Sequence, residues 1–384
     1  MTIIDRLTEW LETRFSSPSY SGLLLAGIAL CLFGAATNTM AGWLYVISGT
    51  IFALLVLGAI LPGRSLRQIK VNRLPISPVS AGEQLTIELE IENTTSKAKT
   101  LLQAKDILPY VLSEPESMAI EAIAPNRVYR WAYNCEVKKR GVYRWHEVQL
   151  KSGAPLGLFW CRRDRQVAAK AIVYPTVLPL TQCPLIDSIG RDDSTVFERD
   201  NRYQLASVGL TRGIRPYRLG DPMRLIHWRT SARFGEFKVR ELEIITGGQE
   251  VVICLDNAFK WEEESFELAV IAAASLYFYA RRCQLNVKLW IGTAGLIEGD
   301  RVILESLAAI NPEEDTTKVN IPSLPLIWLT QNSSSFSSLP AGSRWLFFTP
   351  IATNEIPTSV NTNLPGLAID SKEKLEKQLQ RHLN

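Results

Sequence analysis

Two long apolar runs near the N-terminus constrain the fold of this chain more than any other feature. Residues 21–36 and 41–61 carry no charged side chain and are joined by the short polar segment 37–40. The second run is about 20 residues long, enough for a helix to cross roughly 30 Å of hydrocarbon. The first is shorter but can be extended by Tyr20 and Thr37. Because a bilayer offers no water to the backbone, both runs must be helical, and residues 1–65 are predicted to form a membrane anchor with two transmembrane helices.

The charges around this hairpin predict its orientation. The loop at 37–40 is uncharged, whereas basic residues lie on both outer sides, at Arg6, Arg14, Arg64, Arg67, Lys70 and Arg73. The positive-inside rule therefore places both ends in the cytoplasm. An immediate second run argues against a cleaved signal peptide. We expect a multi-pass plasma-membrane protein whose bulk is cytoplasmic. The six cysteines form no CxxC pair, which agrees with a reducing compartment.

The middle of the chain, residues 66–180, has the pattern of a small β-sandwich. Leu85, Ile87, Leu89 and Ile91 alternate with polar neighbours, as in a half-buried strand. Turn-forming residues separate this run from later runs that are rich in aromatic and β-branched side chains. A polar stretch that lacks apolar periodicity follows, and residues 181–212 are predicted to be a linker.

The last part, residues 213–384, combines an arginine-rich motif with an alternation of strands and helices. Residues 250–256 form a continuous apolar run closed by Asp256, typical of a buried parallel strand. A helix is predicted over 262–282, then a strand over 285–291, a short helix over 302–310 and strands over 324–329, 345–349 and 367–370. Asp370 and Glu373 resemble a capping box for a last helix. The whole chain is therefore predicted to be α+β and multidomain, ending in a doubly wound α/β sheet.

The arginine-rich motif holds seven arginines between Arg212 and Arg240, interleaved with apolar and aromatic side chains. One interpretation is an internal network, in which the arginine stems cover apolar surface and the heads pair with Asp221, Glu236 and Glu241. The other is that some arginines face outward and receive an acidic partner. The overall net charge of +3 is too small to indicate a nucleic-acid binder.

The spacing of the motif resembles a known family signature. The pattern R-x-Y-x-x-G-D-x-x-R-x-I-x-W-x-x-S-A-R is similar to that of the domain-of-unknown-function family number 58. The residues that carry the resemblance are Arg215, Tyr217, Gly220, Asp221, Arg224, Ile226, Trp228, Ser231, Ala232 and Arg233. A second segment, residues 154–159, resembles that family's D-P-F-G-L-F turn, with Ala154 and Leu156 as departures. The resemblance implies a membrane anchor, a von Willebrand factor A-like domain and a MoxR-type AAA+ ATPase as partner.

Asp256 is the sole candidate metal ligand. A von Willebrand A-type site resembles D-x-S-x-S, in which carboxylate and hydroxyl oxygens hold a hard cation such as Mg²⁺. Here Ala258 and Lys260 stand where both serines would be. No metal and no cofactor are therefore predicted, and Asp256 is expected to be a strand-end turn residue or an acceptor for a motif arginine.

Three functions follow from these observations. The first is a non-enzymatic, membrane-tethered scaffold that docks a protein through Arg215, Tyr217, Gly220, Asp221, Arg224, Trp228, Ser231 and Arg233. The second is an undescribed enzyme that uses Asp221, His227 or Asp256, although the sequence lacks a phosphate loop and known hydrolase motifs. The third is binding of anionic lipid or nucleic acid by the arginines. The first is our prediction, since no catalytic constellation is visible.

Overall fold

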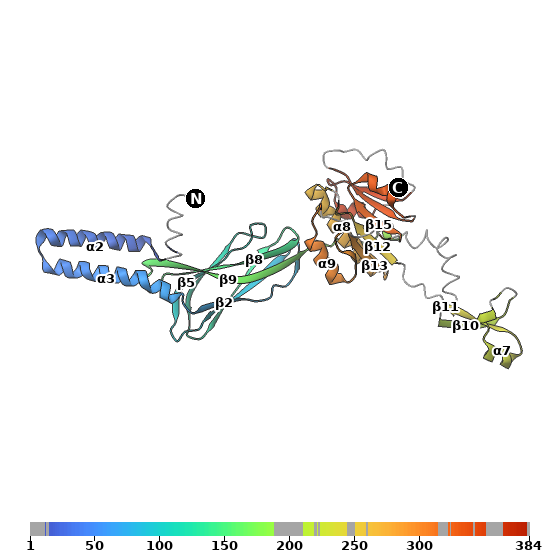
Figure 1. Ribbon diagram of the computed structural model, residues 1–384, viewed down its shortest axis with the longest axis horizontal. Helices are drawn as coiled ribbons and strands as arrows, with labels where there is room; N and C mark the ends of the chain where they lie inside the picture. Colours follow the sequence, from blue (N-terminus) through green and yellow to red (C-terminus); the bar gives the residue numbers. More distant parts are fainter. Residues whose placement is uncertain are drawn as a thin grey trace. The chain divides into compact units, whose positions relative to one another are not determined.

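A computed structural model describes residues 12, 15–187, 210–218, 221, 223–243, 250–258, 260–313, 322, 324–340, 342–350 and 364–381. The chain divides into two compact units, residues 1–174 and 175–384. Figure 1 labels the helices and strands of both units, and each unit is described by itself.

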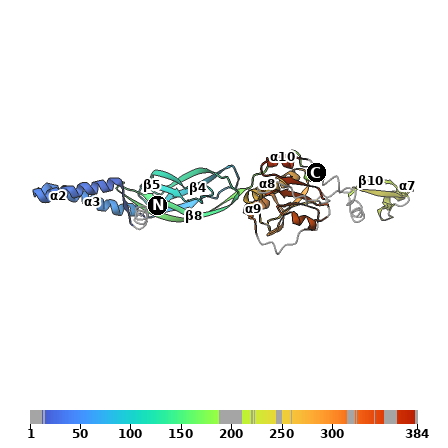
Figure 2. The same ribbon diagram turned by 90° about the horizontal axis from the view of Figure 1, so that it is seen from above.

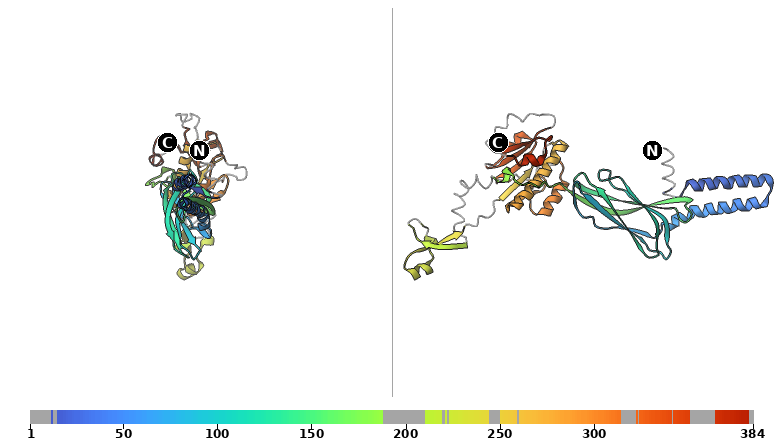
Figure 3. Two further views of the ribbon diagram at one scale, coloured as in Figure 1. Left: turned by 90° about the vertical axis from the view of Figure 1, so that its left-hand side faces the viewer. Right: turned by 180° about the vertical axis from the view of Figure 1, so that it is seen from behind.

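The first unit begins with two antiparallel helices, as the apolar runs predicted. α2 spans Tyr20–Thr39 and α3 spans Gly42–Ser65, side by side in Figure 1 and Figure 3. Both are long and apolar enough to cross a membrane. Small residues line their contact: Ala29 and Ala36 are buried, and the buried Ser48 hydroxyl donates to the Ala29 carbonyl at 3.0 Å. Such small residues let two helices approach closely where no water drives them together.

A turn from the sandwich docks on one end of this helix pair, the end that holds Tyr20 and Ser65 and lies opposite the connection between the helices. We call it the open end. The short strand β1 (Ser17–Pro18) pairs with β9 (Phe159–Tyr174), and the Ser19 amide donates to the Leu158 carbonyl at 2.9 Å. A Cβ on Gly22 would overlap the Leu158 carbonyl oxygen, and a Cβ on Gly58 would lie 3.4 Å from the Phe159 ring. The segment that resembles the family's D-P-F-G-L-F turn therefore joins the sandwich to both helices.

The predicted sandwich is present as two sheets around one core, and all strand pairs are antiparallel except the parallel pair of β3 with β9. Figure 2 shows its strands from above. The three-stranded sheet has the order β2-β4-β7, with bounds Ile69–Arg73, Gln84–Asn93 and Val128–Glu136. The larger sheet has the order β1-β9-β8-β5-β6, with β3 (Val79–Ser80) on β9; β8 is Gly141–Ser152, β5 Lys99–Asp106 and β6 Glu116–Ile123. Leu85, Ile87, Leu89 and Ile91 on β4 are fully buried, so the alternation correctly predicted this strand.

A buried ion pair lies inside the sandwich. The guanidinium of Arg73 pairs with both carboxylate oxygens of Asp106, and their side chains are 2% and 0% exposed. Tyr133 and Trp145 also donate to Asp106, at 2.7 and 3.1 Å. Arg73, one of the charges that we used to orient the hairpin, thus serves the core, where a charge is tolerated only when it is paired and hydrogen-bonded. Burial and the neighbouring Asp106 raise the pKa of Tyr133.

The second unit contains a six-stranded, mostly parallel sheet. Its order is β14-β13-β12-β15-β16-β17, and only β14 is antiparallel to its neighbour. The strands are β12 (Glu250–Leu255), β13 (Asn286–Ile291), β14 (Gly295–Ile297), β15 (Leu326–Thr330), β16 (Arg344–Phe348) and β17 (Gly366–Ile369). The helices are α8 (Glu263–Arg282), α9 (Asp300–Ala309) and α10 (Leu375–Leu379). Each strand and helix predicted here from the sequence is present within a few residues.

The described helices of this sheet gather on one face, which differs from the doubly wound prediction. α8, α9 and α10 all contribute side chains to one core cluster together with Val251, Ile253 and Leu255 of β12, which share one face of the sheet. On the other face, Trp290 and Trp328 pack 5.9 Å apart and Phe336 of the 3₁₀ helix η2 (Ser333–Ser338) joins their cluster. Large aromatic side chains there cover the sheet without an α-helix among the described residues.

Two local predictions differ from the structure, one on residues 175–187 and one on the capping box at Asp370. Residues 175–187, which include α4 (Pro184–Asp187), pack into the α/β core through Leu180, Cys183, Leu185 and Ile186, within the range expected to be sandwich and linker. Asp370 accepts from the Lys372 amide at 2.9 Å, while α10 begins after Lys374. The predicted capping box is therefore wrong. Asp370 closes a turn, and the residue that directly precedes α10 is Lys374.

Candidate functional site: the arginine-rich module

The arginine-rich motif folds into a small module of its own. β10 (Leu210–Pro216) pairs antiparallel with β11 (Lys238–Glu243), and between them lie the 3₁₀ helix η1 (Met223–Leu225) and α7 (Trp228–Phe234). A bridge between Ile226 and Val239 closes the module, and both side chains are buried. This pair of apolar residues is the small core on which the polar motif residues are placed.

Asp221 organises the loop after β10. Both of its carboxylate oxygens receive the guanidinium of Arg215, each at 2.7 Å, and one also accepts from the Arg218 amide at 2.8 Å. These hydrogen bonds from Arg215 and Arg218 lower the pKa of Asp221 to about 2. A carboxylate held by a two-bonded arginine and a backbone amide is a fixed anion, which suits a structural clamp and not a proton acceptor.

His227 and Ser231 hold α7 against β11. His227 Nδ1 accepts from the Thr230 amide at 3.2 Å, and the His227 amide donates to the Lys238 carbonyl at 2.8 Å. Ser231 is buried; its hydroxyl donates to the His227 carbonyl at 3.1 Å and accepts from the Lys238 amide at 2.9 Å. Two residues of the signature, Asp221 and Ser231, thus complete backbone hydrogen bonds that this short loop and helix could not satisfy alone.

Aromatic side chains on the module face solvent. Trp228, Phe234 and Phe237 are 59%, 64% and 56% exposed, and Met223 is 67% exposed. The Phe237 ring makes edge contacts with two other aromatic rings. Its centroid lies 6.1 Å from that of Trp228 and 6.2 Å from that of Tyr217. Trp228 and Phe237 contact each other, and several exposed apolar side chains on one small module mark an interaction surface more than singly scattered ones do. We name Met223, Trp228, Phe234 and Phe237 the aromatic face.

The arginines of the motif divide into two groups. Arg215 belongs to the clamp on Asp221, as the internal-network interpretation expects, whereas Arg218, Arg229, Arg233 and Arg240 are exposed. Glu236 pairs with Lys238 at 3.3 Å. Gly220 and the side chains of Arg224 and Glu241 lie outside the described residues. The internal-network interpretation holds for Arg215 and Asp221 but not for Glu236, and the exposed arginines face outward as the second interpretation requires, while their acidic partner stays a prediction.

Asp256 lies where the ends of three strands meet, and it is hydrogen-bonded to other groups of the protein. Asp256 Oδ2 accepts from the Thr330 hydroxyl at 2.8 Å, its carbonyl accepts from Trp261 Nε1 at 2.6 Å, and Asn257 Oδ1 accepts from the Gly292 amide at 3.1 Å. Burial raises the pKa of the Asp256 carboxyl. This geometry ties the ends of β12, β13 and β15 together, the role of a strand-end turn residue.

The three residues of the enzyme hypothesis have separate partners. Asp221 is bound to Arg215, His227 caps α7, and Asp256 receives Thr330. Across the described part of the chain, no three His, Cys, Asp or Glu side chains gather in a group that could hold a metal ion. The geometry thus supports binding through the module more directly than it supports acid–base chemistry.

Sequence reasoning selected the clamp residues but not the aromatic face as a whole. Trp228 entered through the family spacing, while Met223, Phe234 and Phe237 were not among the predicted site residues. The available signal was the interleaving of aromatic with basic side chains, which does not by itself distinguish a buried ring from an exposed one.

Comparisons with known proteins do not identify the chain. No protein-family model matches it, and no curated protein matches it. A solved CARDB domain from Pyrococcus furiosus is 10% identical over 26% of this chain and 86% of that one, with a TM-score of 0.19. A β-glucosidase from Listeria innocua is 15% identical over 26% and 16%, with a TM-score of 0.16. A GH20 exo β-N-acetylglucosaminidase from Vibrio harveyi is 10% identical over 54% and 45%, also with a TM-score of 0.16. Likenesses this low carry no argument about fold or function.

Proposed function

We propose that this chain is a non-enzymatic, membrane-tethered scaffold whose arginine-rich module docks a protein partner. α2 and α3 anchor it in the membrane, and the remaining domains stand in the cytoplasm. By the resemblance of the motif, the α/β unit is von Willebrand A-like and the partner is a MoxR-type AAA+ ATPase, in complex assembly or maturation. No cofactor is required.

The aromatic face is the observation that carries this proposal. It presents Trp228 and Phe234 together with the exposed Arg229 and Arg233, which are their sequence neighbours on the same short helix α7. Tryptophan and arginine are the residues that most often dominate the affinity of protein interfaces. The buried Ile226–Val239 pair and the Arg215–Asp221 clamp fix the backbone beneath this face, so it is preorganised before a partner arrives.

The charge of the face indicates the chemistry of the partner. Four exposed arginines lie in the module, while Asp221 is already held by Arg215 and Glu236 pairs with Lys238. An acidic surface with an apolar centre would complement it, whereas a uniformly anionic polymer would leave the exposed rings in water. A folded acidic protein therefore fits this face better than nucleic acid does.

The test is the affinity of the purified full chain, in detergent, for the MoxR-type ATPase of the same source. Trp228→Ala is expected to weaken binding about 30-fold, because truncating a central interface tryptophan costs about 2 kcal/mol. Arg229→Ala with Arg233→Ala should weaken it further and flatten the salt dependence of the association rate.

Two controls separate docking from folding. Tyr110→Ala removes an aromatic ring that is 88% exposed on the sandwich, and it should leave affinity unchanged. Arg215→Ala should weaken binding together with the thermal stability of the module, since it leaves Asp221 unpaired. If Trp228→Ala binds the ATPase as tightly as the unaltered chain, the proposed docking surface is wrong.

A further inference from the structure

The outer edge of β6, in the sandwich, carries a row of backbone groups that no strand pairs with. β6 is the last strand of the larger sheet, and among the described strands β5 alone pairs with it. The pairing keeps one register from Glu116 to Ile123, and the strand is exposed except at Ile120 and Ile123. An exposed edge of this length, without a proline or a bulge inside it, can pair with a further strand.

The hydrogen bonds around β5 show which groups of β6 point outward. The Ile107 amide donates to the Glu147 carbonyl at 3.2 Å, on the β8 side of β5. Because backbone groups alternate along an antiparallel strand, the even-numbered residues of β5 bond to the even-numbered residues opposite them on β6. The odd-numbered residues of β6 point away from β5, and at one end the Ile123 carbonyl accepts from Asn93 Nδ2 at 3.1 Å. The described residues supply no such partner to the other three, which we call the outward residues: Ser117, Ala119 and Glu121.

The core of the sandwich is incompletely covered along this edge. Met118 lies on the core face of β6, two positions before Ile120. Ile120 is 2% exposed, whereas Met118 is 37% exposed, although Ala104 opposite it on β5 is fully buried. An added strand would point alternate side chains toward the core, and an apolar one beside Met118 would remove it from water.

The charge of the edge favours a basic occupant. β6 carries Glu116 and Glu121 and no cation, and neither glutamate has an ion-pair partner among the described residues. The two lysines of β5, Lys99 and Lys105, lie on the other side of β6 from the open edge. A second copy of this chain would bring the same two glutamates to the pairing, and like charges across a sheet are unfavourable, whereas opposite charges are favourable.

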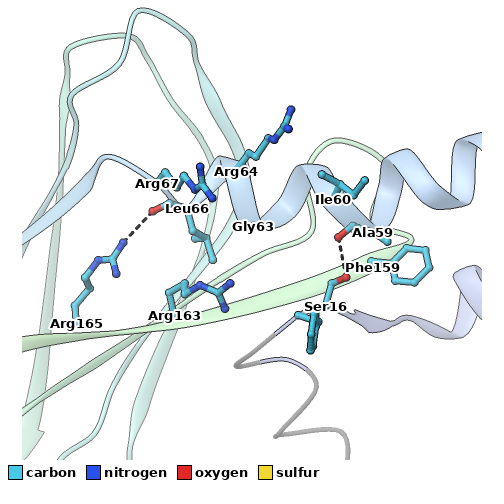
Figure 4. Close-up of a pocket in the computed structure, with 11 residues that line it drawn as sticks. Ser16, Ala59, Ile60, Gly63, Arg64, Leu66, Arg67, Phe159, Arg163 and Arg165 are labelled. Atoms are coloured by element: carbon cyan, nitrogen blue, oxygen red, sulfur yellow. Dashed lines mark hydrogen bonds between the residues drawn. The ribbon is translucent and has the colours of Figure 1, made fainter.

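The other open edges of the sandwich differ from this one. At β2, Arg165 of β9 donates to the carbonyls of Leu66 and Ile69, at 2.9 and 3.4 Å, and so covers the start of the strand. Figure 4 shows its bond to Leu66. At β7, the core-face residues Trp131 and Cys135 are already buried. Among these edges, β6 combines unpaired backbone groups, a half-exposed core residue and unpaired charge.

We propose that β6 is a second docking site, at which an extended basic segment of another protein adds as the next strand of the larger sheet. The backbone of this segment bonds to the outward residues Ser117, Ala119 and Glu121. Its apolar side chains turn toward Met118, and its basic side chains lie beside Glu121. Main-chain hydrogen bonds supply the affinity of such strand addition, and alternate side chains supply the specificity. The site requires neither the arginine-rich module nor the partner of that module.

The experiment measures binding of a fluorescent peptide of alternating lysine and valine to the full chain in neutral detergent, together with hydrogen exchange of the outward amides of β6. The peptide should bind and should slow this exchange. The same peptide with alternate backbone amides N-methylated should bind about tenfold more weakly or worse, because it cannot donate to the edge. A peptide of alternating glutamate and valine should also bind more weakly, since it meets Glu121 with like charge.

Three variants locate the site. Ala119→Pro removes the central outward N–H and should weaken binding of the lysine–valine peptide about tenfold or more, although that N–H makes no bond in the free chain. The matched control is Ala132→Pro on β7, an exposed alanine whose N–H points away from β4, and it should keep full affinity. Glu121→Lys leaves the backbone intact; it should weaken binding of the lysine–valine peptide about threefold to fivefold and strengthen binding of the glutamate–valine peptide by a similar factor.

Trp228→Ala should leave peptide binding unchanged, so that failure of this inference is distinct from failure of docking at the module. No binding of the lysine–valine peptide, equal binding of its N-methylated form, or loss of affinity in Ala132→Pro but not in Ala119→Pro would each overturn the site on β6. Slow exchange of the outward amides before peptide is added would show that the chain covers this edge itself. A dimer that Ala119→Pro dissociates would show that a second copy covers it, and either result would also overturn the proposal.

Discussion

At the scale of single residues, the arginines of the motif differ in role: some stabilise the fold and others are exposed to solvent. Arg215 binds both oxygens of Asp221 and is part of the fold, while Arg229 and Arg233 on α7 face solvent. The difference comes from backbone placement: Arg215 lies on β10 next to the loop that carries Asp221. A change at Arg215 should therefore act on stability and, through it, on binding, whereas a change at Arg229 or Arg233 should act on binding alone.

The clamp predicts a pH dependence of the module. The Arg215 guanidinium lowers the pKa of Asp221 from an ordinary 3.8 to about 2. Because the folded-state pKa is depressed, the stabilisation is fully present above about pH 4 and is lost as pH falls through 2. Pepsin cleavage of the module should accelerate across this window in the unaltered chain. Asp221→Asn should be cleaved faster at pH 4 with little further change, and an equal acceleration in that variant would contradict the assignment.

At the scale of elements, the turn that precedes β9 joins the pair of apolar helices and the sandwich into one unit. Its Leu158 carbonyl accepts from the Ser19 amide, and Ser19 in turn caps α2 by accepting from the Gly22 amide at 3.2 Å. Among the glycines of the two helices, Gly22 and Gly58 are those that the turn approaches most closely. At Gly22 the turn can dock only because the position carries no side chain, whereas a Cβ on Gly58 would make an ordinary contact.

Gly22→Ala should weaken this junction. The new Cβ would overlap the Leu158 carbonyl oxygen, which belongs to the backbone and cannot rotate away. Overpacking of this kind costs about 1–3 kcal/mol. Hydrogen exchange at residues 154–159 should become faster in the full chain in detergent.

Gly27→Ala provides the matched control on the same helix, since nothing lies within 4 Å of its added Cβ. It should leave exchange in the turn unchanged. If both alanines affect the turn alike, the contact between Gly22 and Leu158 does not hold the junction.

At the scale of the whole molecule, the orientation of the helix pair decides in which compartment both units stand. Positive charge at its open end, including Arg64 and Arg67, predicts the cytoplasm. Cys283 provides a native probe, because it is exposed, while four other cysteines are buried and Cys31 lies within α2. A membrane-impermeant maleimide should label Cys283 only after cells are permeabilised. Labelling in intact cells that disappears in Cys283→Ser would reverse the orientation.

Much of the fold could be predicted because its signals are local. The apolar lengths of α2 and α3, the alternation along β4 and the continuous run of β12 each describe how one segment meets its surroundings. The layer arrangement was less accessible. Whether α8, α9 and α10 share one face of the sheet depends on how aromatic side chains far apart in sequence, such as Trp290 and Trp328, cover the other face. The aromatic face could not be predicted either, since the residues next to Phe237 in the sequence do not determine whether its ring is exposed.

The sequence by itself determined which segments are apolar enough to leave water, which alternate as strands, and where arginines concentrate, because these properties depend on neighbours a few positions away. Only the tertiary structure decided which arginines meet which groups. It placed Arg163 and Arg165 beside the end of α3, about a hundred positions earlier in the chain, and turned Asp164 away from them. The physical reason is that the field at a charged side chain depends on distances in space, which chain folding sets and sequence separation does not.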